Sequence, residues 1–403
     1  MCTSISHPPQ LPERGDMRSS GRAVVHVSSV HKAGDIRIFH KECKTLASAG
    51  YKVTYVIPAD QDAIVDGITI RALPPVSGRF QRMTARVWRA YRLARAANGD
   101  IYHLHDPELI PIGMLLRLSR KQVIYDAHED LVDDVLTKEW IPGSLRRVTA
   151  AAVQALLGLA GFSFDGFVAA TPTIARRFPK RKTITVRNYP FPDEFVSPTP
   201  LPFADRPKEA LYIGSISRIR GLTEMVKAIA LVEDARLTVI GQFETQALFD
   251  SIATLSAWQR VDYTPWQPRE RLRSVFSEAR LGLVLFHPER AHLDALPTKL
   301  FEYMAVGLPI VGSNFPLWRE IVDDAQCGLL VDPLDVDAIA RAISYLIENP
   351  EVAQEMGARG RRAILARYNW DSQANALLGL YERVVSGLLS HNENVGHRLG
   401  SAT

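Results

Sequence analysis

The chain has 403 residues, of which 46% are hydrophobic and 23% charged, a composition typical of soluble globular proteins. This length exceeds what one hydrophobic core usually supports, so two domains are expected. The formal net charge of +4 is too small to indicate a nucleic-acid partner.

Cysteine usage and the N-terminal segment bear on compartment. The three cysteines are far apart, which fits neither a disulfide framework nor a clustered metal site, so we expect a cytoplasmic protein. Residues 1–22 are polar and rich in proline and serine, without the apolar core of a signal peptide, and a disordered tail is expected. The sequence has no apolar run long enough for a membrane-spanning helix.

From residue 23 to residue 190, short β-branched runs alternate with longer amphipathic segments, which indicates βαβ units and a parallel sheet covered on both faces. We assign these residues to a first α/β domain. Helices are predicted at 36–49 and 144–160. Strands are predicted at 23–29, 51–57, 68–73, 100–105, 122–128, 166–171 and 183–188.

A second α/β domain follows a proline-rich segment. Residues 189–207 contain six prolines, so we assign 191–208 to a linker. The second domain is assigned to 209–370. A C-terminal helix at 371–390, which can pack back on the first domain, and a flexible tail at 391–403 complete the chain. Strands are predicted at 209–215, 235–241, 260–266, 281–287, 308–314 and 328–333.

Doubly wound parallel sheets bind ligands beyond the carboxyl ends of their strands, so the predicted site is a cleft between the domains. In the first domain, three strand ends carry histidine. Each one taken singly is as readily a structural residue as a catalyst, and no pair has the HExxH spacing of a zinc site. The strand-end residues are His31, Gly34, His105, Asp106, Asp126, His128 and Glu129.

In the second domain, a strand, a glycine-containing loop and a helix follow one another in "YIGSISRIRGLTEMVKAI" (212–229). Gly214 allows a close turn, and Arg218 and Arg220 precede the helix. Backbone N–H groups and two guanidinium groups can bind phosphate there. A solvated basic loop is the alternative, because the segment is neither a P-loop nor a GxGxxG motif.

The stretch "HLDALPTKLFEYMAVGLPIVGSN" (292–314) places a lysine in the first turn of a helix, where the helix dipole disfavours cations. A bound anion would account for Lys299, and Glu302 could accept two hydrogen bonds from a ribose diol. The alternatives are a lysine that reaches water along its aliphatic stem and a capping box at Thr298, although that box would want its acid at Phe301.

At this point the sequence resembles a known family. "PTKLFEYMAVGLPIVGSN", the following "EIV" and "GLLVDP" resemble the nucleotide-binding half of glycosyltransferase family 4, which has the GT-B fold of two Rossmann-like domains facing a central cleft. "GDIRIFHKECKTLASAGYKVTYV", "HDPELIP" and "YDAHED" resemble bacterial members that build surface polysaccharides. The resemblance implies an acceptor-side first domain and a second domain that binds a nucleotide sugar.

The resemblance also implies residue roles. Glu302 is the later acid of the family's E-x7-E pair, expected on the ribose, and Asp294 stands for the earlier acid, expected near the donor sugar. Ser215 stands where the family often has arginine, and Arg220 where it has lysine, so Arg218 is expected to take the missing role. The remaining implied contacts are Lys299 and Gly34 near the diphosphate, Gly214 in the donor loop, His128 at the reacting sugar, and His105 and Asp106 on the acceptor side.

No cofactor or metal is expected, since basic side chains can stabilise a leaving diphosphate. The "DVD" at 335–337 imitates a metal-binding acid motif but precedes a helix, so Asp335 is better interpreted as an N-cap.

Residues 79–97 carry six arginines and no acid beside an apolar stripe. This segment is either a helix on an anionic membrane surface or an ordinary helix with solvated arginines, and 144–162 repeats the pattern with fewer charges.

We therefore expect a retaining glycosyltransferase that moves a sugar from a nucleotide-diphosphate donor to a hydroxyl of a lipid-linked saccharide. The pathway would be exopolysaccharide, capsule or lipopolysaccharide synthesis, on the inner face of the cell membrane. A sugar-nucleotide epimerase of the same layout and a non-catalytic nucleotide-sugar-binding partner are the alternatives. A nicotinamide-dependent oxidoreductase is disfavoured because no GxGxxG follows the first strand.

Overall fold

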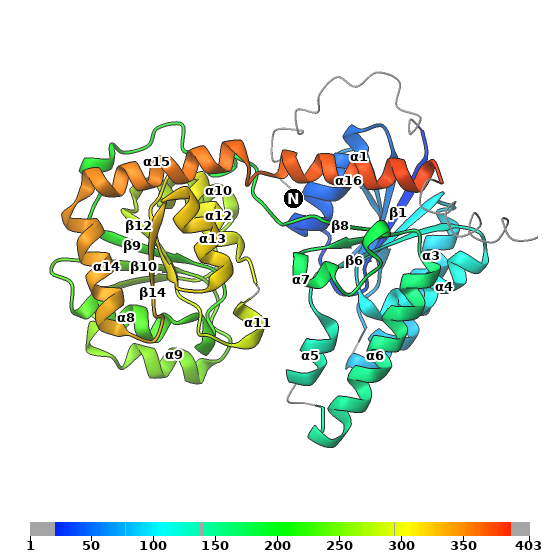
Figure 1. The fold of residues 1–403 in the computed structure, drawn as a ribbon, viewed down its shortest axis with the longest axis horizontal. Coiled ribbons are helices and arrows are strands. Elements are labelled where there is room, and N and C mark those ends of the chain that lie inside the picture. The colour runs from blue at the N-terminus through cyan, green and yellow to red at the C-terminus, as the bar shows by residue number, and fades with distance from the viewer. Residues whose placement is uncertain (1–20, 77, 138–140, 294, 388–403) are drawn as a thin grey trace, which may run out of the picture. The chain divides into compact units, whose positions relative to one another are not determined.

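The computed structural model describes residues 21–76, 78–137, 141–293 and 295–387. The chain forms two compact units, each built around one sheet (Figure 1). Unit 1 contains the described residues up to Asn188 together with those from Asp371 onward, and unit 2 contains Tyr189–Trp370.

The sheet of unit 1 has eight strands in the order β3-β4-β2-β1-β5-β6-β7-β8. All neighbouring pairs are parallel except β3 and β4. The strands are β1 (Ala23–Val27), β2 (Lys52–Pro58), β3 (Ala63–Val65), β4 (Ile68–Leu73), β5 (Ile101–Leu104), β6 (Gln122–Ala127), β7 (Gly166–Ala169) and β8 (Thr183–Thr185).

The edge strand β3 was not among the predicted strands. Asp66 and Gly67 join it to β4 with positive φ angles of 51° and 76°. An Asp-Gly pair suits the two-residue turn of a hairpin, so the sequence carried this signal. The strand is only three residues long, too short for its alternation to stand out.

The two faces of this sheet differ in chemistry because successive strand residues point to opposite sides. One face is apolar: Val25, Val27, Tyr102 and Leu104 belong to a hydrophobic cluster that also includes residues of α3, α4 and α6. The helices of unit 1 are η1 (Ile36–Cys43), which has π-type winding, α1 (Lys44–Ser48), α2 (Gly78–Gln81), η2 (Arg82–Arg86), also π-type, α3 (Val87–Ala96), η3 (Pro107–Leu109), α4 (Ile110–Leu118), α5 (Leu131–Thr137), α6 (Gly143–Ser163), α7 (Pro172–Ala175), η4 (Lys180–Lys182) and α16 (Trp370–Val385).

The other face of the same strands carries polar side chains. His26 and His103 are register partners on β1 and β5, and both alternate with the apolar set. Helix α16 covers them, since the Tyr381 hydroxyl lies 2.8 Å from Nδ1 of His103. The C-terminal helix therefore belongs to unit 1, although the intervening residues form unit 2.

The sheet of unit 2 has six parallel strands in the order β11-β10-β9-β12-β13-β14. Hydrophobic clusters lie on both sides of it. The strands are β9 (Glu209–Ile213), β10 (Arg236–Ile240), β11 (Val261–Thr264), β12 (Leu281–Val284), β13 (Ile310–Ser313) and β14 (Gly328–Val331). The helices are η5 (Phe203–Asp205), η6 (Arg218–Arg220), α8 (Leu222–Ala230), α9 (Gln246–Ala253), η7 (Ser256–Arg260), α10 (Arg269–Glu278), α11 (Arg290–Leu293), α12 (Thr298–Ala305), α13 (Pro316–Ala325), α14 (Val336–Glu348) and α15 (Pro350–Ala366).

Two α/β units with parallel sheets confirm the predicted fold class, and every strand predicted from the sequence has a counterpart. The proline-rich segment lies within unit 2. Phe195 and Phe203 from this segment are buried in the two cores of that unit, and Arg361 donates a hydrogen bond to the carbonyl of Pro192. Much of the segment therefore packs as part of unit 2.

Candidate active site

In unit 2, a buried lysine faces the loop that follows the first strand. Lys299 lies in the first turn of α12, is only 5% exposed, and its Nζ has no hydrogen-bond partner among the described residues. A Cβ placed on Gly214 would lie 3.0 Å from this Nζ, so the glycine lets the backbone approach the amine. The φ of Gly214 is +135°, a conformation that side-chain-bearing residues rarely adopt.

Aromatic rings hold this lysine next to Arg220. Nζ of Lys299 lies 3.7 Å from the ring centroid of Tyr212 and 5.5 Å from that of Phe286, and Cζ of Arg220 lies 5.2 Å from the same Phe286 ring. Burial, and next the charge of Arg220, lower the pKa of Lys299 well below its usual value, while Glu302 acts in the opposite direction. Lys299 and Arg220 thus pack against the same aromatic ring, and aromatic contacts alone stabilise two neighbouring cations only weakly when no anion is bound.

The structure decides between the interpretations of Lys299 offered above. An amine that reached water along its aliphatic stem would be exposed, and this one is buried, so that alternative is wrong. The capping box is also wrong, because the N-cap of α12 is Pro297 rather than Thr298. Arg218 behaves differently from Arg220: its side chain is 71% exposed and lies 3.4 Å from Glu289.

Glu302, one helical turn after Lys299, has a partner that sequence reasoning missed. Arg269, the first residue of α10, lies with Nη2 3.5 Å from Oε1 of Glu302 and with Nε 2.7 Å from Oε1 of Glu194. Its guanidinium also lies over the ring of Phe195, with 4.5 Å between Cζ and the centroid. Arg269 therefore holds the carboxylate of Glu302 at the same end of the sheet as Lys299.

Two further predictions concern acidic residues in unit 2. Asp294, expected near the donor sugar, lies outside the described residues. Asp335 accepts a hydrogen bond from the backbone N–H of Ala338 at 2.9 Å and caps α14, which confirms its interpretation as an N-cap.

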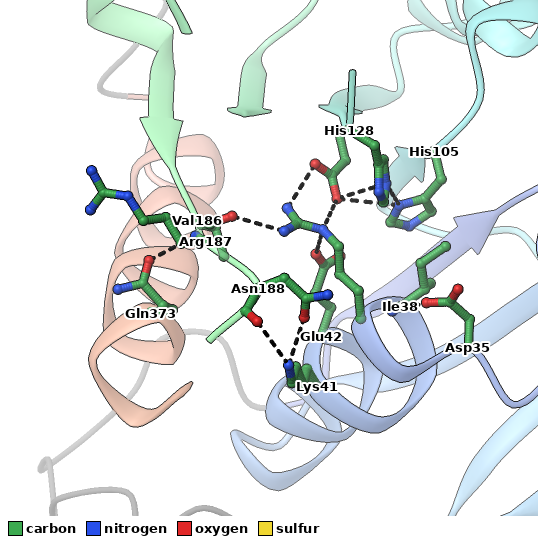
Figure 2. A network of polar contacts seen from close by, with 12 residues as sticks. Asp35, Ile38, Lys41, Glu42, His105, His128, Val186, Arg187, Asn188 and Gln373 are labelled. Carbon is green, nitrogen blue, oxygen red and sulfur yellow. Dashed lines mark hydrogen bonds and ion pairs between the residues drawn. The ribbon is translucent and has the colours of Figure 1, made fainter. Parts of the chain in front are cut away.

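In unit 1, a polar network lies at the carboxyl ends of β1, β5 and β6, where Figure 2 labels His105 and His128. Asp126 is the hub of this network. Arg37 of η1 donates two hydrogen bonds to it, from Nε at 3.1 Å and from Nη2 at 3.0 Å. Nε2 of His128 lies 3.2 Å from Oδ2 of Asp126, and Nδ1 of His105 lies 3.4 Å from the same oxygen. Burial opposes ionisation of Asp126, but Arg37 and His128 hold its pKa well below the usual range.

The other residues predicted for this unit lie near the network. Asp106 accepts hydrogen bonds from the hydroxyl of Ser28 at 2.8 Å and from the backbone N–H of Ser29 at 2.6 Å. His31 lies 3.0 Å from Asp35, and this contact raises the pKa of His31. Gly34 is exposed with open space where a Cβ would point, so no packing contact requires glycine there.

Comparison with known proteins assigns the family. The family described as "Glycosyl transferases group 1" matches residues 195–363, and "Glycosyltransferase Family 4" matches residues 37–187. The chain belongs to the family 4 glycosyltransferases. The first match falls in unit 2 and the second in unit 1, so both units of this glycosyltransferase are covered.

The glycosyltransferase is similar to curated proteins along most of its length. The MMP α-(1→4)-mannosyltransferase of Mycolicibacterium hassiacum is 24% identical over 322 residues, which are 74% of this chain and 74% of the relative. The phosphatidyl-myo-inositol mannosyltransferase of Mycobacterium leprae is 23% identical over 365 residues, 85% of this chain and 91% of the relative.

Solved structures show the same fold at lower identity. Sucrose-phosphate synthase from Thermosynechococcus elongatus aligns with a TM-score of 0.72 at 20% identity, over 91% of this chain and all of that chain (100%). Anabaena HepE in complex with UDP-glucose aligns with a TM-score of 0.67 at 13% identity, over 91% of this chain and 99% of that chain. The GT-B fold expected for the glycosyltransferase is thereby confirmed.

The arginine-rich segment of the glycosyltransferase is only partly solvated. Val87, Ala90 and Ala94 of α3 are buried against the sheet. Arg86 donates hydrogen bonds to the carbonyls of Ser29 and Pro74. Trp88 remains 55% exposed. Among the residues that the structure describes, no helix combines the length and the apolar character needed to span a bilayer.

Proposed function

We propose that this glycosyltransferase takes its sugar from a nucleoside-diphosphate donor, which binds at the Gly214 loop of unit 2. The observation that carries the proposal is Lys299, a buried amine without a hydrogen-bond partner among the described residues, packed beside Arg220. A buried cation at a helix N-terminus calls for an anion, and a diphosphate supplies one. The UDP-glucose complex of Anabaena HepE, which has the same fold, is consistent with such a donor.

In this proposal Lys299 and Arg220 neutralise the charge that develops on the departing diphosphate. Cations already fixed in a water-poor site stabilise that charge without reorganising during the reaction, and no metal ion is required for this step. Glu302 accepts hydrogen bonds from the ribose hydroxyls, with its carboxylate held by Arg269. Arg218, at the surface of the same loop, supplies further positive charge to the incoming donor.

His128 acts at the sugar in the proposed mechanism, together with Asp294. The contact with Asp126 fixes the orientation of the His128 ring. Transfer proceeds with retention of anomeric configuration: the leaving phosphate accepts the proton of the attacking hydroxyl as the new glycosidic bond forms on the same face of the sugar. Gly34 would lie near the diphosphate, and His105 and Asp106 would lie on the acceptor side.

The proposed acceptor is a lipid-linked saccharide of a surface polysaccharide. A relative whose name specifies a phosphatidylinositol acceptor, the mannosyltransferase of Mycobacterium leprae, supports a lipid-borne acceptor. The exposed Trp88 and the basic residues of 79–97 would place the enzyme on the anionic inner face of the cell membrane.

The test starts from a binding screen of nucleoside-diphosphate sugars, followed by turnover on membrane lipid extracts with the donor that binds. We expect one donor class to bind, Glu302→Ala to weaken that binding by about tenfold or more, and Lys227→Ala, which removes an exposed lysine of the same unit, to keep it. The product should keep the donor's anomeric configuration by NMR. Donor epimerised without acceptor would instead identify an epimerase, and binding without turnover on any acceptor would identify a non-catalytic partner.

A further inference from the structure

Three histidines and a glutamate form a buried cluster behind the network of unit 1. His26 lies on β1, His103 on β5, His105 directly after β5, and Glu42 on η1. One potential ligand atom from each residue lies within 4.8 Å of all the others, and all four residues are at most 3% exposed. Three strand-borne imidazoles and a carboxylate from a covering helix are thus gathered in the interior of the unit.

Hydrogen bonds among these side chains leave specific acceptors unused. Nδ1 of His26 lies 2.8 Å from Nε2 of His105, and Nδ1 of His103 lies 2.8 Å from the Tyr381 hydroxyl. Nε2 of His103 has no hydrogen-bond partner among the described residues. The Glu42 carboxylate accepts no hydrogen bond among them either, although it lies 3.1 Å from Nε of Arg37, and burial together with the neighbouring Asp126 raises the pKa of Glu42 well above its usual value. Buried polar atoms are nearly always hydrogen-bonded, so unused acceptors in one cluster indicate a missing ligand.

The charges of the cluster point to a cation. Two fully buried carboxylates, Glu42 and Asp126, share one guanidinium. Arg37 donates two hydrogen bonds to Asp126 and one to the carbonyl of Val186, and its contact with Glu42 is an ion pair at 3.1 Å. The amine of Lys41, the next cation along η1, donates instead to Asn188 (Figure 2). One negative charge at Glu42 is therefore left to be balanced by a proton or by a metal ion.

We propose that His26, His103, His105 and Glu42 bind one Zn²⁺ ion. Imidazole nitrogen and carboxylate oxygen are ligands that Zn²⁺ takes at roughly 2.0–2.2 Å, and four protein ligands are typical of its structural sites. Binding replaces the hydrogen bond between His26 and His105 and draws the four ligand atoms together around the ion. The Tyr381 hydroxyl at His103 and the Asp126 carboxylate at His105 then orient two ligands from outside, as second partners of metal-bound histidines commonly do.

The proposed ion has a structural role. It joins η1 to β1 and β5, and so fixes the helix whose Arg37 holds Asp126. It does not contact the diphosphate, so the zinc proposal does not depend on the proposed function.

A second set of potential ligands, His105, Asp126 and His128, is partly exposed and shares one histidine with the first, so the experiment has to separate the two sets.

The experiment measures metal in the full-length protein, purified through a tag without histidines and without chelators. We expect about one zinc per chain by mass spectrometry, a fall in Tm on chelation, and recovery of Tm when Zn²⁺ is returned. Replacement by Co²⁺ should give the intense visible absorption of a four-coordinate site rich in nitrogen.

Matched substitutions locate the ion. Glu42→Gln and His103→Gln should each weaken Zn²⁺ binding by at least about tenfold. His31→Gln, which alters a partly exposed histidine outside the cluster, should leave zinc content unchanged. Zinc lost in His128→Gln but retained in His103→Gln would place the ion in the other set and overturn the proposal.

The proposal is also overturned if the parent protein carries no zinc above background and neither Zn²⁺ nor Co²⁺ raises its Tm. A proton on Glu42 would then balance the charge. Should the Glu42 and His103 variants fail to fold, the metal content and Co²⁺ spectrum of the parent protein decide the question alone.

Discussion

Replacing Lys299 by methionine should have opposite effects on stability and on donor binding. The substitution leaves an unbranched side chain that is one atom shorter, and it removes the charge. In the free protein, the ammonium is buried and has aromatic rings but no hydrogen-bond partner among the described residues. Replacing an unpaired buried charge with an apolar group of similar volume typically stabilises a fold by about 1–3 kcal/mol, less the cation–π attraction that is lost. We expect Lys299→Met to raise the free energy of unfolding of the unliganded protein.

Binding of a nucleoside diphosphate should weaken in the same variant. The amine and a phosphate oxygen in contact would attract by about 4 kcal/mol at the effective dielectric of a protein site, before the cost of desolvating the phosphate. A charged hydrogen bond is worth about 1.5–3 kcal/mol net, so the dissociation constant should rise by about 10- to 100-fold. Titration calorimetry with UDP and GDP, together with urea denaturation, measures both effects, and Lys227→Met serves as the surface control.

The pH dependence supplies a check with a definite sign. Because the folded pKa of Lys299 lies below its usual value of 10.5, the unfolded chain binds more protons between these two pH values. The contribution of this residue to the unfolding free energy therefore rises with pH across that window, and Lys299→Met should remove the rise. Binding of a diphosphate within the window should take up a proton. The reasoning is refuted if Lys299→Met binds the diphosphate as tightly as the parent protein does.

Three other substitutions test neighbouring parts of the site. Glu302→Ala should raise the dissociation constant of the donor by about tenfold or more with little change in Tm, because Arg269 keeps its pairing with Glu194; unchanged affinity would remove Glu302 from the ribose site. His128→Ala should lower kcat much more than donor affinity, and equal losses in both would contradict its place at the reacting sugar. Gly214→Ala should cost about 1–3 kcal/mol of stability, measured by urea denaturation, since the backbone there has a φ of +135° and the new methyl group meets the lysine; a parent-like urea midpoint would show that the backbone tolerates a side chain.

The sequence predicted the fold and the proximity of Lys299 to Arg220. Alternation of β-branched and amphipathic segments is a local property, so the strands around each sheet could be located without the structure. Lys299 and Arg220 stand 79 positions apart, yet both follow strands of one parallel sheet, and the carboxyl ends of such strands meet at one edge. That rule predicts their proximity, and the shared ring of Phe286 bears it out.

Contacts that depend on how helices pack or on strand register could not be predicted. Arg269 reaches Glu302 because α10 begins beside α12, a consequence of packing that no local pattern encodes. Only part of the histidine cluster could be predicted from the sequence. His103 and His105 alternate onto one face of a strand, but their proximity to His26 depends on the register of β1 against β5. Glu42 enters only because η1 covers that face.

Helix α16 has a consequence for how the protein is made. Leu377, Leu380 and Tyr381 are fully buried, and a side chain on Gly166 of β7 would meet Leu380 at 3.2 Å. During synthesis, the first half of the chain leaves the ribosome before α16, so the part of the sheet that α16 covers stays exposed until that helix emerges. A product that stops at residue 188 would lack that helix, so expression of the N-terminal half alone should give an aggregation-prone fragment, whereas a chain that continues the first unit through a short linker into 371–387 should be soluble.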